Sequence, residues 1–393
     1  MKRLAVAFAA TLLLVIVPAG LAQAQAAEED NQVIFCGRLT PEDCDLLNAS
    51  QDAMLTLASG EASNIIEISI GGADSTAARP ASLRLTSLST FATTPETIER
   101  MAELSAMDPA ELVADPALVA ESMMLPLQVD TAQTGIIEFS PELADLVEAR
   151  TGIDLPNELE YNTRMVDGVL YIRVADFAGL VPQITMFGDW IGIEMDAIMP
   201  LVLDSAAEKA EAGEAPADTE DLVEGMEPPG SAMTSAYVVM IEPGQEEAYA
   251  SFLELVALRD TTIEGNEAAV YGMKMDVPRY FVSPVFAEHV RSMLVERGST
   301  EADSSIWVPM VGASMALLFR NASAEVQQSV DLSNANTYDI DMALSWTLGG
   351  VNLRVDIAAE NRSLDSVSAI PAPEDAFVPP LRLIMPLLSS LGG

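Results

Sequence analysis

The chain has 393 residues, half of them apolar, and carries 60 acidic residues against 19 basic ones, for a formal net charge of −41. So acidic a surface repels phosphate groups, which excludes nucleic acid as a partner and disfavours anionic lipid headgroups. The apolar fraction is large enough to build one or two sizeable hydrophobic cores.

Residues 1–26 have the features of a bacterial-type signal peptide. Lys2 and Arg3 precede an apolar run from Leu4 to Val17, and the small residues around Ala24 suit a signal peptidase. The apolar run is too short to span a bilayer comfortably, so we expect residues 1–26 to be removed. The sequence therefore predicts a secreted or periplasmic, extracytoplasmic protein.

Cys36 and Cys44 are the only cysteines, and we interpret residues 27–60 as a disulfide loop followed by the first helix. In an oxidising compartment a close, isolated pair is most simply a disulfide. A structural zinc site is the first alternative, but it needs four ligands and the chain has a single histidine, His289. A lipidated cysteine is the second. It requires a small residue before the cysteine, and Phe35 stands there, so we expect no lipid anchor.

The hydrophobic pattern of residues 61–376 predicts one domain with both helices and strands. Helical spacing predicts helices over residues 44–58, 95–124 (in pieces), 141–151, 177–203, 246–255 and 278–297. Alternation predicts strands over residues 64–70, 82–88, 136–139, 159–165, 169–174, 233–241, 268–275, 324–332, 337–348, 351–360 and 365–370. Asp167-Gly168 is a strong tight-turn signal between two of these strands.

Three further segments interrupt this pattern. Residues 206–231 are rich in Ala, Glu, Asp, Pro and Gly, which predicts an exposed acidic loop. Residues 307–319 are strongly apolar but too short for a membrane span. Residues 377–393 form an apolar tail broken by prolines, which we expect to dock back onto the domain.

No arrangement of residues in the sequence is typical of an enzyme. A Ser-His-Asp or Cys-His site would need His289, which falls between Phe286 and Val290 on an apolar helical face, so we expect a buried or half-buried structural role for it. The chain has no Gly-x-Ser-x-Gly, His-Glu-x-x-His or phosphate-binding glycine-rich motif. We therefore predict no catalytic residue, no metal site and no cofactor.

Three segments carry a resemblance to a known family. They are Asp-Gly-Val-Leu-Tyr-Ile-Arg at 167–173, Tyr-Asp-Ile-Asp-Met-Ala-Leu at 338–344 and Ser-Ala-Ile-Pro-Ala-Pro-Glu-Asp-Ala at 368–376. With the order of predicted elements, they resemble the half-barrel lipoprotein carriers, the LolA/LolB and LppX/LprG groups, over most of residues 50–376. The resemblance implies an α+β fold in which a curved antiparallel sheet wraps several helices. The chain departs from the LppX/LprG group in its acidic insert and in lacking a recognisable lipid anchor.

The resemblance also implies a non-enzymatic protein that binds or carries a lipid-like ligand in a cavity between sheet and helices. Such binding buries acyl chains at about 0.8 kcal/mol per CH₂, and 20 methionines offer deformable walls. The aromatic residues that we expect to line the cavity are Tyr171, Trp190, Phe281, Phe286, Trp307, Tyr338 and Trp346. The alternative hypothesis is an extracytoplasmic protein–protein interaction module that binds an envelope protein and no small ligand.

Overall fold

The computed structural model describes most of the region downstream of the predicted signal peptide. The described residues are 33–55, 57–72, 79–105, 107, 115–152, 154–180, 186, 188–195, 197, 239–263, 265–296, 301–348, 350–364 and 367–380. The predicted signal peptide, the acidic loop 206–231 and residues 381–393 of the tail lie outside this set. In the part of the chain that is described, no helix is long and apolar enough to cross a membrane.

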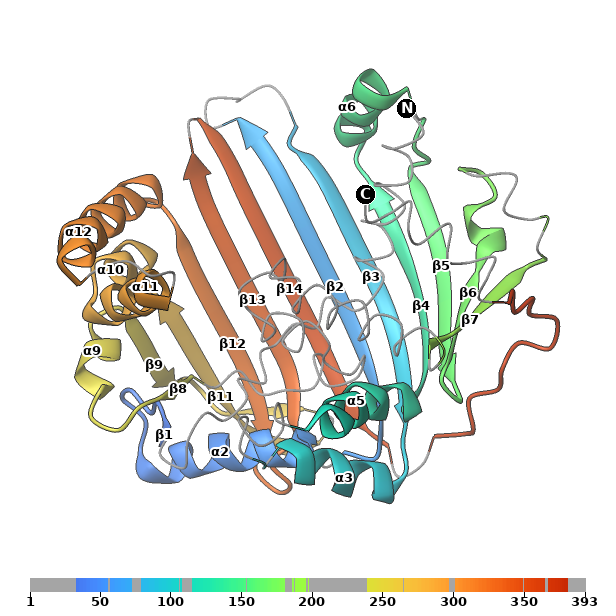
Figure 1. Ribbon diagram of the computed structural model, residues 1–393, viewed down its shortest axis with the longest axis horizontal. Coiled ribbons are helices and arrows are strands. Elements are labelled where there is room, and N and C mark those ends of the chain that lie inside the picture. Colours follow the sequence, from blue (N-terminus) through green and yellow to red (C-terminus); the bar gives the residue numbers. More distant parts are fainter. Residues whose placement is uncertain are drawn as a thin grey trace.

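Twelve strands within the described residues form one open, curved antiparallel sheet (Figure 1). In chain order they are β2 (Ser59–Gly72), β3 (Ala81–Ala92), β4 (Asp130–Phe139), β5 (Glu158–Val166), β6 (Val169–Arg173), β7 (Trp190–Glu194), β9 (Leu253–Ala257), β10 (Thr261–Ile263), β11 (Asn266–Met275), β12 (Ser323–Asp331), β13 (Thr337–Leu348) and β14 (Val351–Ser363). The spatial order is β10-β11-β12-β13-β14-β2-β3-β4-β5-β6-β7, with β9 beside β11. The predicted α+β fold with a curved antiparallel sheet is confirmed.

The pairing of β14 with β2 joins two meanders from opposite ends of the chain. It runs over the whole of β14, from Val351 opposite Gly72 to Ser363 opposite Gly60. Strands β2 to β7 therefore form one half of the sheet, and β9 to β14 form the other. No local pattern in the sequence indicates this junction, because the two strands are separated by most of the chain.

Helices gather at the two ends and at one side of the sheet (Figure 1). They are α2 (Pro41–Leu55), α3 (Pro95–Ser105), α5 (Pro116–Met124), α6 (Pro141–Thr151), α9 (Glu246–Ala250), α10 (Val277–Phe281), α11 (Pro284–Glu296) and α12 (Glu301–Leu318), with the short 3-10 helices η1 (Leu125–Gln128) and η2 (Val174–Phe177). A two-stranded sheet pairs β1 (Val33–Ile34) with β8 (Met240–Ile241). Helices α2, α3 and α5 lie across one end of the strands, and α6 lies near the other end.

Helix α6 shows how local sequence sets the ends of an element. Ser140 caps its first turn by accepting a hydrogen bond from the Leu143 backbone N–H, and Pro141 occupies the first helical position. Gly152 ends the helix in the left-handed conformation, at a φ of 72°. Because all three signals are local, the predicted bounds 141–151 match the structure.

Two predicted helices are partly wrong because strand pairing overrides local helical spacing. Residues 190–194, expected within a helix, form strand β7 and pair with β6. The predicted helix over residues 246–255 ends at Ala250, and Leu253–Ala257 become β9, paired with β11.

The last third of the chain brings three further differences. The predicted helix over residues 278–297 is broken at Val282 and Ser283, where the Ser283 hydroxyl accepts a hydrogen bond from the Phe286 N–H and starts α11. The apolar segment 307–319 lies mostly in helix α12, which continues through Pro309. The strand expected at 365–370 is absent from its described part, residues 367–370.

The hydrophobic core forms where helices cover one face of the sheet. Leu47 of α2 packs with Tyr271 of β11 and Val330 of β12. At the other end of the strands, Leu143 and Val147 of α6 pack against the cluster formed by Leu85, Ile137, Phe139, Leu155, Leu159 and Tyr161. The strand residues in both clusters lie on the same face of the sheet, which we call the helix-bearing face.

Cys36 and Cys44 form the expected disulfide, with 5.5 Å between their Cα atoms. The bridge ties the loop before α2 to the first turn of that helix. The loop itself contacts the sheet, since the Arg38 N–H donates to the Leu255 carbonyl at 3.0 Å. The disulfide therefore helps to hold α2 against the β9–β11 edge.

Candidate ligand-binding site

The helix-bearing face of the central strands is an apolar surface built from both halves of the sheet. Cross-strand pairing places Met342 beside Ile357, and Ile357 beside Ile66. The apolar residues on this face of β12, β13, β14, β2 and β3 include Val326, Met342, Leu344, Trp346, Leu353, Val355, Ile357, Ile66, Ile68, Ile70, Leu83 and Leu85. We call this set the apolar surface.

Much of the apolar surface remains partly exposed. Ile70 is 48% exposed, and Ile68, Val355 and Ile357 are intermediate between buried and exposed. Among the described strand residues, none on the helix-bearing face of β12–β14 or β2–β4 is charged. A contiguous, partly exposed apolar surface is typical of a binding site rather than of an ordinary solvent-facing sheet.

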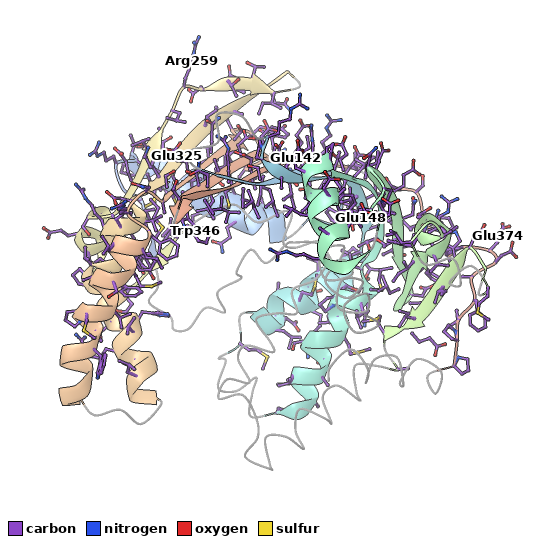
Figure 2. All side chains as sticks on the ribbon, turned by 90° about the horizontal axis from the view of Figure 1, so that it is seen from above. Glu142, Glu148, Arg259, Glu325, Trp346 and Glu374 are labelled. Atoms are coloured by element: carbon purple, nitrogen blue, oxygen red, sulfur yellow. A yellow bond between two sulfur atoms is a disulfide. The ribbon has the colours of Figure 1, made fainter. Side chains whose placement is uncertain are left out.

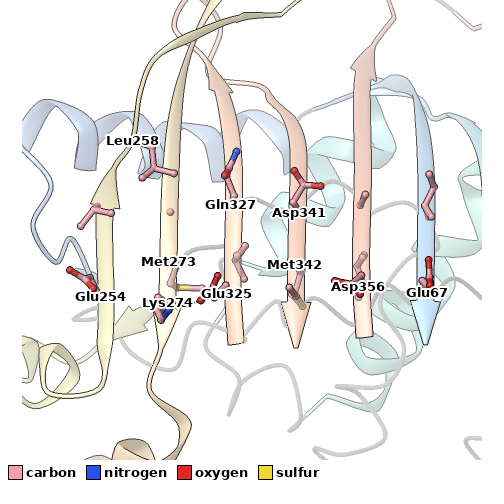
Figure 3. Close-up of a pocket in the computed structure, with 17 residues that line it drawn as sticks. Glu67, Glu254, Leu258, Met273, Lys274, Glu325, Gln327, Asp341, Met342 and Asp356 are labelled. Atoms are coloured by element: carbon pink, nitrogen blue, oxygen red, sulfur yellow. Dashed lines mark hydrogen bonds and ion pairs between the residues drawn. The ribbon is translucent and has the colours of Figure 1, made fainter. Parts of the chain in front are cut away.

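The opposite face of the same strands is charged. A row of paired residues crosses six strands there: Glu254, Lys274, Glu325, Ala343, Asp356 and Glu67 (Figure 3). Lys274 Nζ lies 2.5 Å from Glu325 Oε1, and this hydrogen bond raises the pKa of the Lys274 ammonium. The charged row lines an open groove of about 510 Å³.

The sheet therefore separates charge from apolar surface by the alternation of its strands. Glu325 and Trp346 lie on opposite sides of it, with Trp346 on the side from which the helices extend (Figure 2). Acidic residues are numerous in the chain, so their exclusion from one face of the central strands is a specific feature of the fold.

Trp346, one of the predicted cavity residues, lies on the apolar surface at the end of β13. Its ring centroid is 5.2 Å from that of Phe319, which follows α12. Phe319 in turn lies 5.2 Å from Phe281, and Phe281 lies 5.1 Å from Phe286. The structure thus links three predicted residues, Trp346, Phe281 and Phe286, but Phe286 is buried inside the helical cluster with Val308.

Tyr171 and Trp190 are brought together elsewhere, on the charged side of β6 and β7. Tyr171 is buried in a cluster with Val166 and Ile370, and Trp190 packs against this cluster. The Arg164 guanidinium lies 5.2 Å from the centre of the Trp190 ring. Because residues 367–377 cover this corner, these two aromatics lie away from the apolar surface.

Tyr338 and Trp307 also lie away from the apolar surface. The pairing of β12 with β13 shifts register between Ser329 and Val330. Because of this shift, Tyr338 does not follow the alternation by which Ile340, Met342 and Leu344 lie on the helix-bearing face. Its hydroxyl donates to Asp331 Oδ2 at 2.5 Å and accepts from Asn266 Nδ2 at 2.7 Å. Trp307 is 52% exposed on α12.

A band of buried, uncharged polar residues borders the apolar surface and was missed by sequence reasoning. Its members are Gln328, Asn361, Asn64, Ser87 and Gln133, each less than a tenth exposed. The sequence does carry a sign of this band: in a strand of alternating polar and apolar residues, a polar residue stands at a position where an apolar one is expected. Gln133 Nε2 donates to the Tyr161 hydroxyl at 3.2 Å, and burial raises the pKa of Tyr161 to about 12 despite a hydrogen bond with Ser87.

No group of three or more His, Cys, Asp or Glu side chains among the described residues could hold a metal ion. His289 is exposed on α11, contrary to the buried or half-buried position expected from sequence, because Phe286 and Val290 form the buried side of that helix.

Comparisons with known proteins return structural likeness only. No family model and no curated protein matches the chain. Among solved structures, LprF from Mycobacterium bovis matches with a TM-score of 0.32 at 10% identity, over 85% of this chain and 99% of LprF. The lipoprotein LppX from Mycobacterium tuberculosis gives 0.25 at 9% identity, over 84% of this chain and all of LppX (100%).

A LolA superfamily protein from Nitrosomonas europaea also matches, with a TM-score of 0.15 at 7% identity, over 82% of this chain and 94% of that protein. Two of these structures bear the names of LppX and the LolA superfamily, the groups that the sequence was expected to resemble. The likeness concerns the arrangement of sheet and helices and carries no information on a ligand.

Proposed function

We propose that the protein is a non-enzymatic, extracytoplasmic carrier that binds a lipid-like ligand against the apolar surface of its sheet. The observation that carries this proposal is that the described residues on one face of β12–β14 and β2–β4 are uncharged and in part exposed, in a chain with a net charge of −41. Burying an acyl chain there gains about 0.8 kcal/mol per CH₂ before the costs of association. Such binding needs no catalytic group.

The disulfide supports the proposed location. A bridge between Cys36 and Cys44 is stable outside the reducing cytoplasm. It also occupies the Cys36 sulfur, the atom that a lipid anchor at this position would need. We propose that the protein is exported by the signal at residues 1–26 and is not lipid-anchored.

Helix α12 favours the alternative function, a protein–protein interaction module. From Trp307 to Leu318 it contains no charged residue, and Trp307, Met310 and Leu317 are each more than half exposed. Exposed apolar side chains on a helix are a usual contact surface for a partner protein. A module of this kind would use α12 and leave the apolar surface of the sheet without a small ligand.

Native mass spectrometry of the exported protein, purified without detergent, tests the proposal. We expect an additional mass that organic extraction releases as lipid. A protein that carries no lipid and takes none up from vesicles would contradict the carrier function.

Two neighbouring substitutions on β2 locate the binding face. Ile68→Asp puts a charge on the apolar surface and should abolish lipid binding, because the ligand would bury an unpaired carboxylate. Ser69→Asp puts the same charge on the opposite face, where Ser69 pairs with Arg354, and should leave lipid binding unchanged. Urea unfolding of both variants confirms that the fold is retained.

A further inference from the structure

We infer that the ligand has an uncharged polar head, and that the buried polar band around Asn361 binds it. This inference rests on the proposed carrier function and adds the chemical class of the ligand. Asn361 is 4% exposed on the helix-bearing face of β14. The site would accept a head with hydroxyl or amide groups, such as a monoacylglycerol.

The polar band lies in two adjacent rows of the sheet. In one row Asn64 pairs with Ser87, and Ala359 pairs with Asn64 on its other side. The next row contains Asn361, opposite Ala62, and Gln133, opposite Ser89. The apolar surface begins at the neighbouring row on the other side, where Ile357 pairs with Ile66. Polar and apolar rows therefore meet directly, as an amphiphile requires.

Asn361 is distinguished from the rest of the band by its unpaired amide. Among the residues that the structure describes, neither its Nδ2 nor its Oδ1 has a hydrogen-bond partner, although both atoms are buried. Gln133, by contrast, donates to Tyr161. An unpaired buried amide destabilises the fold, and a ligand that both donates and accepts a hydrogen bond would recover this cost.

The absence of charge selects against ionic heads. The described strand residues on this face of β12–β14 and β2–β4 include no acid or base, so a carboxylate, phosphate or ammonium would be buried without a counter-ion. The net charge of −41 further disfavours an anion. A head with only hydroxyl groups avoids both the cost of burying an unpaired charge and the repulsion by the acidic chain.

The apolar surface is long enough to contact the tail of such a ligand. From Asn361 to Leu353 the strand β14 rises by roughly 26 Å, at about 3.3 Å per residue. Ile357, Val355 and Leu353 occupy the helix-bearing side along this path. A head held at Asn361 therefore directs an acyl chain along the apolar surface towards Trp346, which pairs with Leu353.

The test compares three probes with the same acyl chain: 1-oleoylglycerol, methyl oleate and oleate. Their affinities are measured by native mass spectrometry and by titration of the full chain stripped of bound lipid. We expect the wild type to bind 1-oleoylglycerol at least tenfold more tightly than methyl oleate, which has no donor, and than oleate, which is charged.

Asn361→Leu keeps the approximate size of the side chain and removes its amide. This variant should bind 1-oleoylglycerol tenfold more weakly, keep its affinity for methyl oleate within twofold, and be at least as stable to urea as the wild type. Asn352→Leu is the matched control, because Asn352 lies on the charged face of the same strand and its Oδ1 accepts a hydrogen bond from Thr347. It should leave all three affinities unchanged.

The outcomes separate this inference from the carrier function. Equal binding of the three probes by the wild type, or a preference for 1-oleoylglycerol that survives Asn361→Leu, overturns the polar-head site and leaves the carrier function standing. Asn361 would then hold only water. No binding of any probe overturns both.

Discussion

Ile357 of β14 lies directly opposite Ile66 of β2 at the junction of the two halves of the sheet. Met342 extends the same row on one side, and Leu85 extends it on the other. Residues from opposite ends of the chain thus form one apolar row, and the proposed ligand would contact both halves at once. Ligand binding is therefore expected to stabilise the junction between the two meanders.

The three tryptophans should respond differently to a ligand. Trp346 lies on the apolar surface, whereas Trp190 packs beneath Arg164 and Trp307 is exposed on α12. In the Trp190→Phe/Trp307→Phe variant, bound 1-oleoylglycerol should shift the Trp346 emission to shorter wavelength. The Trp190→Phe/Trp346→Phe variant keeps Trp307 alone and should show no shift. A response from Trp307 alone would place the ligand on α12 instead.

Tyr161 should make the protein sensitive to alkaline pH. Burial raises the pKa of its phenol to about 12, above the ordinary value of 10.0. Below pH 10 the phenol is protonated in both states and has no effect; as the pH rises towards 12, the unfolded chain loses the proton first. The free energy of unfolding should fall by on the order of 2–3 kcal/mol from this group.

Urea unfolding of the wild type and Tyr161→Phe between pH 8 and pH 12 measures that contribution. The variant loses the hydrogen bond from Gln133, so it should be about 1 kcal/mol less stable at pH 8. Its stability should decline less at high pH, and the two curves should converge or cross. Parallel curves would show that Tyr161 titrates normally.

Reduction of the disulfide should weaken the fold. Closing the loop from Cys36 to Cys44 stabilises the protein by roughly 2.5 kcal/mol in the chain-entropy model. Dithiothreitol should lower the urea midpoint of the wild type accordingly. The Cys36→Ser/Cys44→Ser variant should already have the lower midpoint, and the reductant should not change it further. An effect of dithiothreitol on that variant would exclude the disulfide as the cause.

Gly135 should be intolerant of a side chain. A Cβ atom at this position of β4 would lie 2.5 Å from a carbon of the Tyr161 ring and 2.6 Å from the Thr86 carbonyl oxygen. Gly135→Ala should therefore destabilise the protein by about 1–3 kcal/mol, measured by urea unfolding. At Gly179 a Cβ would meet no atom within 4 Å among the described residues, so Gly179→Ala should change the stability by less than about 0.5 kcal/mol.

Features that depend on neighbouring residues could be predicted from the sequence. Helical spacing predicted α6 over residues 141–151, and Asp167-Gly168 predicted the turn between β5 and β6. Alternation predicted most of the long strands, including the apolar side of β13 at Ile340, Met342, Leu344 and Trp346. Local patterns also predicted the helix at residues 246–250, but they extended it into β9, which forms only by pairing with β11.

How these strands combine into one surface depends on long-range pairing, which is seen only in the folded protein. Alternation shows that each strand has a polar and an apolar side, but the pairing of β14 with β2 decides that the apolar sides of both meanders share one face. For the same reason, aromatic character alone did not indicate which residues lie on the apolar surface. Tyr338 departs from the alternation at a register shift, and Tyr171 is covered by a segment that follows it by about two hundred residues.

The sequence also gives no sign that Asn361 differs from other asparagines. Its amide stands out only in the folded sheet, where no described residue is its hydrogen-bond partner. Long-range pairing, which no local pattern encodes, thus gives the described residues of the central strands β12–β14 and β2–β4 one charged and one uncharged face.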